Sequence, residues 1–195
     1  MKKQNFLVKN YSLCWKFFIE CRWHIVLALT IFFFFFLIGF ALPIFFRATI
    51  FEFLSKLVGS LEGKSTFEII QFIFFNNLKA SFFALLFGIG LGVFPIVTGA
   101  INGYLVGFVA REVAGTEGIL ILWKLLPHGI FELPAVFFSM GMGMKVGFSL
   151  FNRKKAKKNF QRNLIEAIRF FVFVVIPLLI VAGIIEGLLI GSTTA

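Results

Sequence analysis

Two ionisable residues stand close together in a stretch that is otherwise apolar, LLPHGIFELPAVFF. His128 and Glu132 are four positions apart, and on a helix positions i and i+4 share a face. Ala135 and Ser139 continue that face at spacings of three and four residues. Ionisable groups at membrane depth are costly and usually turn away from lipid toward partners or cavities. We therefore expect this face of the helix to point into the protein.

Three kinds of chemistry fit His128, Glu132 and a further isolated carboxylate, Glu186. The first is a hydrogen-bonded cluster that fixes how the helices align. The second is a proton or ion path, because histidine titrates near neutrality. The third is metal binding, although these three ligands fall short of a typical site. Hydrolytic catalysis is disfavoured because the sequence has only two His and no Asp, and we expect no catalytic residue, metal or cofactor.

The composition is that of an integral membrane protein. Hydrophobic residues make up 59% of the 195 residues, with a mean hydropathy of +0.97, against roughly 45–50% apolar residues in soluble domains. The net charge of +10 would favour nucleic acid as the partner of a soluble protein. Here the charges sit in short segments between apolar runs, as membrane orientation requires. We therefore expect the lipid bilayer, and no nucleic acid, as a partner.

The hydrophobic pattern predicts an all-α, multi-pass helical bundle that forms a single membrane domain over residues 1–195. The first span, 25–46, has 22 residues and would measure about 33 Å, enough for a hydrocarbon core of roughly 30 Å. Asn76 and Asn77 are predicted to cap the second span, and a tight turn near 98–103 to separate it from the third. The predicted elements are an interfacial amphipathic helix at 4–23, membrane helices at 25–46, 78–98, 101–114, 127–150 and 167–191, and an outer surface segment at 47–76.

The charges of the connecting segments predict which side each one occupies. Residues 1–24 carry five basic and one acidic residue, and residues 152–169 carry seven and one. Residues 47–79 carry four basic and three acidic residues, and residues 111–124 carry two of each. Because cytoplasmic loops collect Lys and Arg, five spans place the N-terminus in the cytoplasm and the C-terminus outside.

Small residues recur every four positions on several of the predicted helices. In lipid, such stripes let helix backbones approach closely, which is a main cause of helix association. Bulky replacements of Gly103 or Gly187 should therefore destabilise the protein. Exposed stripes can also pair two chains, so a homodimer is compatible with the sequence. The stripes are Gly88 and Gly92; Gly99, Gly103 and Gly107; Ala135, Ser139, Gly143 and Gly147; and Gly183, Gly187 and Gly191.

The predicted topology places the ionisable residues in one half of the membrane. Glu132 and Glu186 each lie about five residues, or roughly 8 Å, from the outer end of a helix. Arg47 and Arg111 fall at the outer ends of the first and third spans. The sequence therefore predicts an intramembrane polar cluster of His128, Glu132 and Glu186 with the two arginines as counter-ions.

Several motifs together resemble the stage II sporulation protein M family. They are LPHGIFELPAVF followed by GMGMKVG, with NNLKASFFALLFGIGLG and NGYLVGFVA upstream and VAGIIEG near the end. The resemblance covers residues 76–187. The residues typical of the family correspond to Asn77, Asn102, Gly103, Pro127, His128, Gly129, Glu132, Pro134 and Glu186.

The resemblance implies a multi-pass protein of the cell membrane without known enzymatic activity. In spore formers the namesake anchors a complex with peptidoglycan-degrading partners that drives membrane migration during engulfment. We therefore expect a non-enzymatic scaffold that recruits other membrane or envelope proteins. The alternative is a small transporter or channel component in which the histidine and glutamates line a proton or ion pathway.

Overall fold

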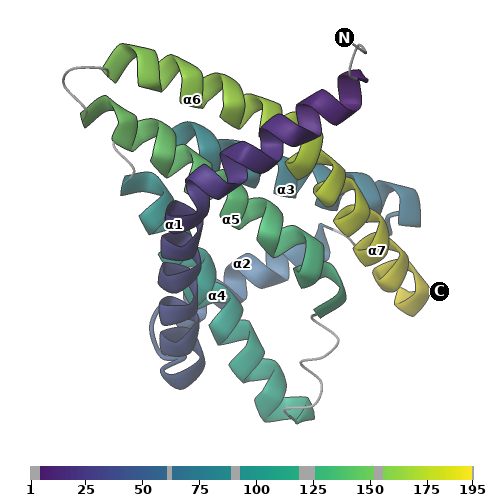
Figure 1. The fold of residues 1–195 in the computed structure, drawn as a ribbon. Helices are drawn as coiled ribbons and strands as arrows, with labels where there is room; N and C mark the ends of the chain where they lie inside the picture. The colour runs from purple at the N-terminus through teal and green to yellow at the C-terminus, as the bar shows by residue number, and fades with distance from the viewer. Residues whose placement is uncertain (1–4, 61–62, 89–92, 119–125, 152–155, 195) are drawn as a thin grey trace.

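The computed structural model describes residues 5–60, 63–88, 93–118, 126–151 and 156–194, and these are helical apart from short turns. Within them no strand is present, so the all-α prediction is confirmed. Two short segments interrupt the α-helices, a 3₁₀ turn at Ser149–Phe151 and a π-helix at Phe171–Val175. The helices, shown in Figure 1, are α1 (Phe6–Ala41), α2 (Arg47–Gly59), α3 (Thr66–Gly88), α4 (Val93–Glu117), α5 (Leu126–Phe148), α6 (Ala156–Phe170) and α7 (Ile176–Thr194).

Five helical segments are long and apolar enough to cross a membrane, which confirms the predicted number of spans. One of them, Gly129–Phe151, has 61% of its most apolar stretch buried, against 22–33% in the other four. α5 is therefore the central helix of the bundle. The five segments are Phe6–Ala41, Thr66–Gly88, Val93–Thr116, Gly129–Phe151 and Ala156–Leu189.

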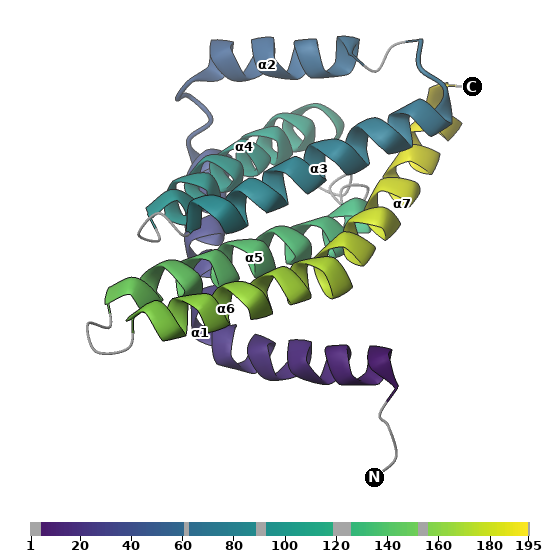
Figure 2. The ribbon, with the colours of Figure 1, turned by 90° about the horizontal axis from the view of Figure 1, so that it is seen from above.

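The predicted interfacial helix and first span form one continuous helix, α1. Its 36 residues would measure about 54 Å if straight, much more than a hydrocarbon core of about 30 Å. The helix accordingly bends, as Figures 1 and 2 show. Cys14, Phe17 and Cys21 in its first part pack with Ala167 and Phe170 of α6, whereas its second part packs on α4.

The second membrane helix begins twelve residues earlier than the predicted 78, at Thr66. Ser65 and Glu68 form a capping box: the Ser65 N–H donates to Glu68 Oε2 at 2.8 Å, and the Glu68 N–H donates to Ser65 Oγ at 3.4 Å. Such reciprocal bonds satisfy two free N–H groups at a helix start. The predicted cap at Asn76 and Asn77 was therefore wrong, because both residues lie inside α3.

The predicted turn near 98–103 was also wrong. α3 ends at Gly88 and α4 begins at Val93, so Gly99, Asn102 and Gly103 lie inside α4. Pro95 stands in the first turn of α4, where its missing N–H costs little. Glycine and asparagine favour turns in most sequences, but in a membrane helix the same residues serve close packing.

α6 and α7 are joined without a break through the π-helical turn at Phe171–Val175. Pro177 explains the turn, because proline cannot donate to the carbonyl four residues earlier and its ring clashes with it. At this point the Ile176 N–H bonds the Phe171 carbonyl, five residues back. The amphipathic α6 thus continues into the apolar α7 as one bent helix (Figure 2).

Glycines allow α4 to touch α1 backbone to backbone. A Cβ atom added to Gly103 would overlap the Phe32 carbonyl oxygen, and one added to Gly107 would overlap that of Phe36. Both pairs advance in the same direction along their helices, so α1 and α4 run parallel. The FFFFF run is thus divided, with Phe32 buried and Phe33 and Phe34 more than half exposed on the lipid side.

Glycines also allow close packing of the central helix α5 on α3 and α1, and of α7 on α3. A Cβ on Gly143 would lie 2.7 Å from the Leu85 carbonyl oxygen of α3, and one on Gly141 would lie 2.8 Å from the Ile25 nitrogen of α1. Real Cβ atoms essentially never come within 3.0 Å of other atoms. On α7, Gly187 faces Ile70 and Gly183 faces Phe74, so α7 runs antiparallel to α3.

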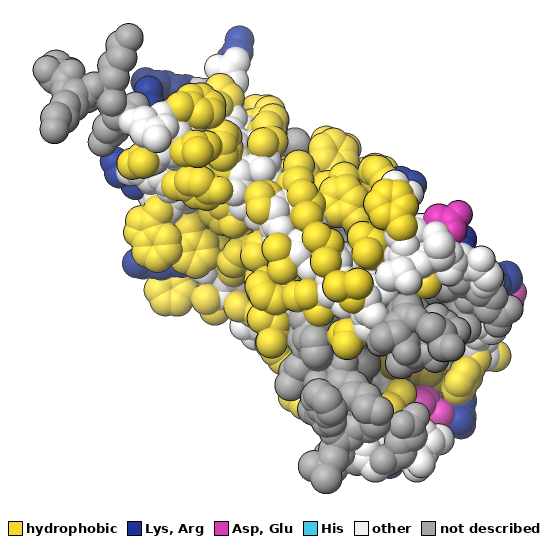
Figure 3. All heavy atoms as spheres, turned by 90° about the vertical axis from the view of Figure 1, so that its right-hand side faces the viewer, with side chains coloured by type: hydrophobic (Ala, Val, Ile, Leu, Met, Phe, Trp, Pro, Cys, Tyr) yellow, Lys and Arg dark blue, Asp and Glu magenta, His cyan; other side chains and the backbone are white. Residues whose placement is uncertain are grey.

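The contacts of Gly143 with Gly88 and of Gly141 with Ile25 bring the ends of α3 and α5 together beside the middle of α1, and α4 begins next to the end of α3. We call this end of the bundle the basic end. There the Glu20 carboxylate binds Lys145 at 3.6 Å and Arg162 at 2.5 Å, which ties α1, α5 and α6 together. In Figure 3, Lys and Arg side chains appear without carboxylates at the upper left, whereas toward the right Lys and Arg stand beside carboxylates. This asymmetry agrees with a cytoplasmic N-terminus.

We predict that Gly103→Leu destabilises the protein by at least about 2 kcal/mol, because the new side chain meets backbone atoms that cannot move aside. Gly115→Leu is the matched control on the same helix, since a Cβ there meets no atom within 4 Å. Thermal unfolding in detergent measures both variants. Equal melting temperatures for the wild type and Gly103→Leu would show that the α1–α4 contact is not this tight.

Candidate functional site: a polar pair between parallel helices

Buried polar side chains of α3 and α5 meet where these two helices pack together. Asn77 of α3 is only 8% exposed, and its side chain forms a hydrogen bond with the Glu132 carboxyl of α5. The pair differs by 55 in residue number, as does the glycine contact between Gly88 and Gly143. The tight glycine contact and the polar pair therefore belong to one parallel alignment of the two helices.

Glu186 of α7 completes the cluster from a third helix. Its carboxylate lies close enough to Glu132 to interact with it electrostatically. Glu186 stands between Gly183 and Gly187, the two residues through which α7 packs on α3. The structure thus brings Glu132 and Glu186 together and adds Asn77 as the partner of Glu132.

Two serines extend the polar surface toward the basic end. Ser81 follows Asn77 by one turn of α3 and is fully buried, and its Oγ has no hydrogen-bond partner among the described residues. Ser139 of α5 is 1% exposed, and its Oγ donates to the Ala135 carbonyl at 2.9 Å. Small hydroxyl side chains permit close helix contact in membranes.

Of the remaining family-motif residues in α5, the structure describes the side chains of some and not of others. Pro127 and His128 lie in the first turn of the helix, but their side chains fall outside the described part of the structure. Gly129 is half-buried, and Pro134 lies inside the helix. The role of His128 therefore stays a prediction.

The two arginines contact other residues than the predicted carboxylates. Arg47 NH2 donates to Glu112 Oε2 at 3.1 Å, and the Arg111 guanidinium lies 5.7 Å from the centre of the Phe40 ring. These contacts tie the start of α2 and the end of α1 to α4. They place both arginines near the end of the bundle opposite the basic end.

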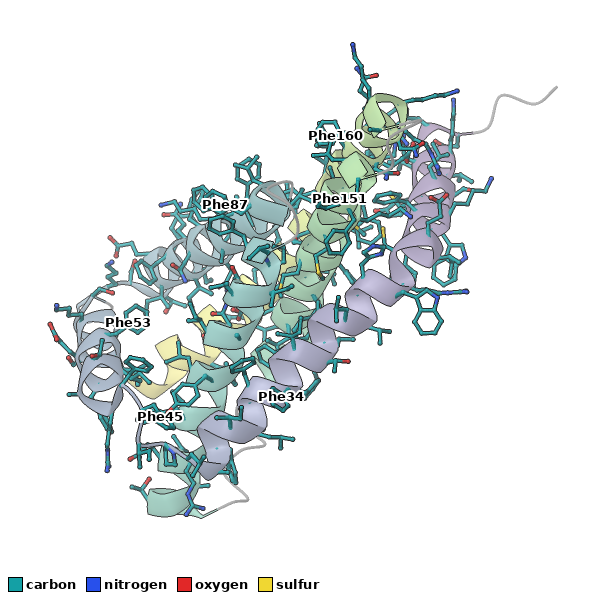
Figure 4. The ribbon with its side chains drawn as sticks, turned by 90° about the vertical axis from the view of Figure 1, so that its left-hand side faces the viewer. Phe34, Phe45, Phe53, Phe87, Phe151 and Phe160 are labelled. Carbon is teal, nitrogen blue, oxygen red and sulfur yellow. The ribbon has the colours of Figure 1, made fainter. Side chains whose placement is uncertain are left out.

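Asn102, a further family residue, lines an apolar groove of about 720 Å³ between α2, α1 and α4. Phe45 and Phe53 also line this groove (Figure 4). The adjacent Tyr104 fixes the turn before α2: its hydroxyl accepts from the Phe45 N–H at 3.1 Å and lies 3.0 Å from the Leu42 carbonyl oxygen. Phe46 in that turn has a positive φ of 57°.

The polar cluster lines neither of two cavities in the described part of the chain. The groove beside α2 and a smaller cavity of about 230 Å³ near Trp15 are both lined without Asn77, Glu132 or Glu186. Nor do three His, Cys, Asp or Glu side chains gather as metal ligands among these residues. The cluster is therefore suited to hold helices together by internal hydrogen bonding and electrostatics.

The fold and the cluster define a helical-bundle integral membrane protein whose buried polar groups connect its central helices. Residues 24–189, most of the chain, match the model of the family described as stage II sporulation protein M. The chain belongs to this family, which is not a known family of enzymes.

The chain is also similar to two uncharacterized proteins of Methanocaldococcus jannaschii. It is 30% identical to MJ0706 over 146 residues, which cover 71% of this chain and 64% of that protein. It is 30% identical to MJ0793 over 115 residues, which cover 57% and 65% respectively. Each match thus spans less than two thirds of the relative. No solved structure matches the chain.

Sequence reasoning gave Asn77 the wrong role, although a signal for the right one is present. The buried residues of α3 recur at Ile69, Ile73, Asn77, Ser81 and Ala84. Asn77 and Ser81 therefore continue a helical stripe of buried positions. Polar residues in such a stripe indicate hydrogen bonding between helices.

We predict that Asn77→Ala lowers the free energy of unfolding by about 1–2 kcal/mol, because Glu132 loses its hydrogen-bond partner. Asn76→Ala is the control from the neighbouring exposed position and should change stability by no more than about 0.5 kcal/mol. A double-mutant cycle of Asn77→Ala with Glu132→Leu should give a coupling of about 0.6–1.7 kcal/mol. Strictly additive effects would contradict the pairing.

Proposed function

We propose that the protein is a non-enzymatic scaffold of the cell membrane that anchors or recruits other membrane or envelope proteins. One observation carries this proposal: Asn77, Glu132 and Glu186 interact with one another inside the bundle, and none of them lines either of the two cavities described above. A rigid helical bundle whose inner polar residues form contacts with one another is suited to present its outer surface to partner proteins.

The family supports the same proposal. Its sporulation namesake, which the sequence motifs resemble, anchors peptidoglycan-degrading partners at the cell membrane. We infer a comparable anchoring role, with membrane-bound or envelope proteins as partners. The backbone-to-backbone contacts of α1 with α4 and of α3 with α5 would keep such a surface constant in shape.

The competing function is transport of protons or ions past Glu132 and Glu186. It would require a water-accessible route to the carboxylates, since intramembrane ionisable residues of transporters line cavities. The two cavities described above lie elsewhere. The scaffold is therefore the better-supported function.

We expect tagged protein, crosslinked in its native membranes and then purified, to bring down a defined set of membrane or envelope proteins. Glu132→Gln should bring down the same set, because an amide keeps the hydrogen bond to Asn77. An unrelated tagged five-span protein serves as the control for nonspecific capture. Recovery of the same proteins with this control, or of none with the wild type, would contradict the scaffold.

Purified protein in liposomes should show no pH-driven flux of protons or monovalent cations above that of empty liposomes. Glu132→Gln should behave in the same way, because the scaffold does not use the carboxylate charge for transport. A pH-sensitive dye inside the liposomes measures the flux. Flux through the wild type that Glu132→Gln abolishes would favour the transporter instead.

A further inference from the structure

Lys79 is a charged residue in the middle of a membrane-spanning helix. It lies 13 residues from Thr66 and 9 from Gly88, the two ends of α3. At 1.5 Å per residue these distances are about 20 and 13 Å, within a hydrocarbon core about 30 Å thick. The sequence prediction counted Lys79 with the outer segment, and the true start of α3 moves it into the span.

The side chain of Lys79 points away from the bundle. The buried residues of α3, including Asn77 and Ser81, occupy the opposite face of the helix. Around Lys79, the exposed side chains of Phe75, Phe82 and Phe83 have 46–52% of their surface accessible. In Figure 4, the labelled Phe87 projects from the last turns of the same helix. We call this surface, formed by Phe75, Asn76, Lys79, Phe82 and Phe83, the lysine face.

In the described part of the chain, Lys79 has no ion pair and no hydrogen bond, whereas most carboxylates there are engaged. Glu132, at the level of Lys79 along α3, is held by Asn77 on the other side of the helix. The ion pairs of the described residues join other side chains: Arg47–Glu112, Lys56–Glu52, Lys145–Glu20, Arg162–Glu20 and Arg169–Glu166.

A lone lysine at this depth is costly, by about 2.5–3.5 kcal/mol on insertion scales. Lysines near helix ends escape this cost by extending to the interface. Helical side chains lean toward the N-terminus of their helix, and for α3 that is the more distant end, about 20 Å away. A partner group within the membrane is therefore the more effective way to satisfy the charge.

A second copy of the chain does not provide that group. A two-fold dimer presents the same surface from both subunits, so pairing through the lysine face would bring Lys79 against Lys79. Like charges in a medium of low polarity repel strongly. The lysine face is therefore suited to a different protein.

We propose that the lysine face binds a transmembrane helix of a partner protein that carries an Asp or Glu in its central part. The carboxylate pairs with Lys79, the exposed Asn76 amide donates a further hydrogen bond, and the phenylalanines pack against the partner's apolar side chains. This inference rests on the proposed scaffold function and states the chemistry of the partner.

The test uses synthetic polyleucine transmembrane peptides with Glu, Gln or Lys at the central position. Energy transfer between labelled peptide and labelled full-length protein in phosphatidylcholine vesicles reports binding. The wild type should bind the Glu peptide about tenfold more tightly than the Gln peptide. Lys79→Arg should keep this preference, Lys79→Gln should lose it, and Lys79→Glu should prefer the Lys peptide.

Lys157→Glu, which changes an exposed lysine at the basic end, is the control and should keep the preference for the Glu peptide. All variants should unfold at the wild-type temperature, since these side chains face outward. Equal binding of the three peptides to the wild type would overturn the proposal, as would a preference that survives Lys79→Gln. It would also be overturned if Lys79→Gln altered only the enrichment of an anionic lipid around the protein.

The scaffold and the lysine face can fail separately. If native membranes yield specific partners but the peptides show no preference, the lysine face is wrong and the scaffold stands. If the peptides show the preference but native membranes yield no partner, the lysine face stands and the scaffold is wrong.

Discussion

Close contact between helix backbones is the constraint on which the rest of this structure depends. Lipid tails are as apolar as leucine, so helices in a membrane gain little by covering their hydrophobic side chains. Gly103 and Gly107 lie on carbonyls of α1, and Gly143 lies on carbonyls of α3. Because a contact at this distance fits only one alignment, it also sets which polar residues face each other. The alignment that joins Gly88 to Gly143 is the one that joins Asn77 to Glu132.

The two ends of the bundle are fastened by polar contacts of a different kind. At the basic end, Glu20 is shared by Lys145 and Arg162, which come from two other helices. At the opposite end, the Tyr104 hydroxyl holds the turn before α2, and Arg47 reaches Glu112. Exposed ion pairs contribute little to stability individually. Their main effect is to fix where the surface helices lie on a bundle that glycines already hold together.

Local signals predicted much of the fold, and features that depend on contacts between helices were missed. The number of spans, the packing role of Gly103 and Gly187, and the nearness of Glu132 to Glu186 follow from hydropathy and helical spacing. The start of α3 was misplaced because Asn76 and Asn77 resemble caps, although Ser65 and Glu68 carry the true signal. The pairing of Asn77 with Glu132 joins helices 55 residues apart in the chain, and no local pattern specifies that pairing. The structure also shows Arg47 and Arg111 engaged with Glu112 and Phe40.

Asn77 and Lys79 of α3 point in opposite directions, one into the bundle and one toward the membrane. They are two positions apart, which turns them to opposite sides of a helix. The inward residue is satisfied by Glu132, whereas the outward residue has no partner in the described part of the chain. A transport pathway would need a water-accessible route to the inner polar groups. The arrangement found has Glu132 engaged with Asn77 inside the bundle and the Lys79 charge turned toward the membrane, and this distribution favours a protein that binds other membrane proteins.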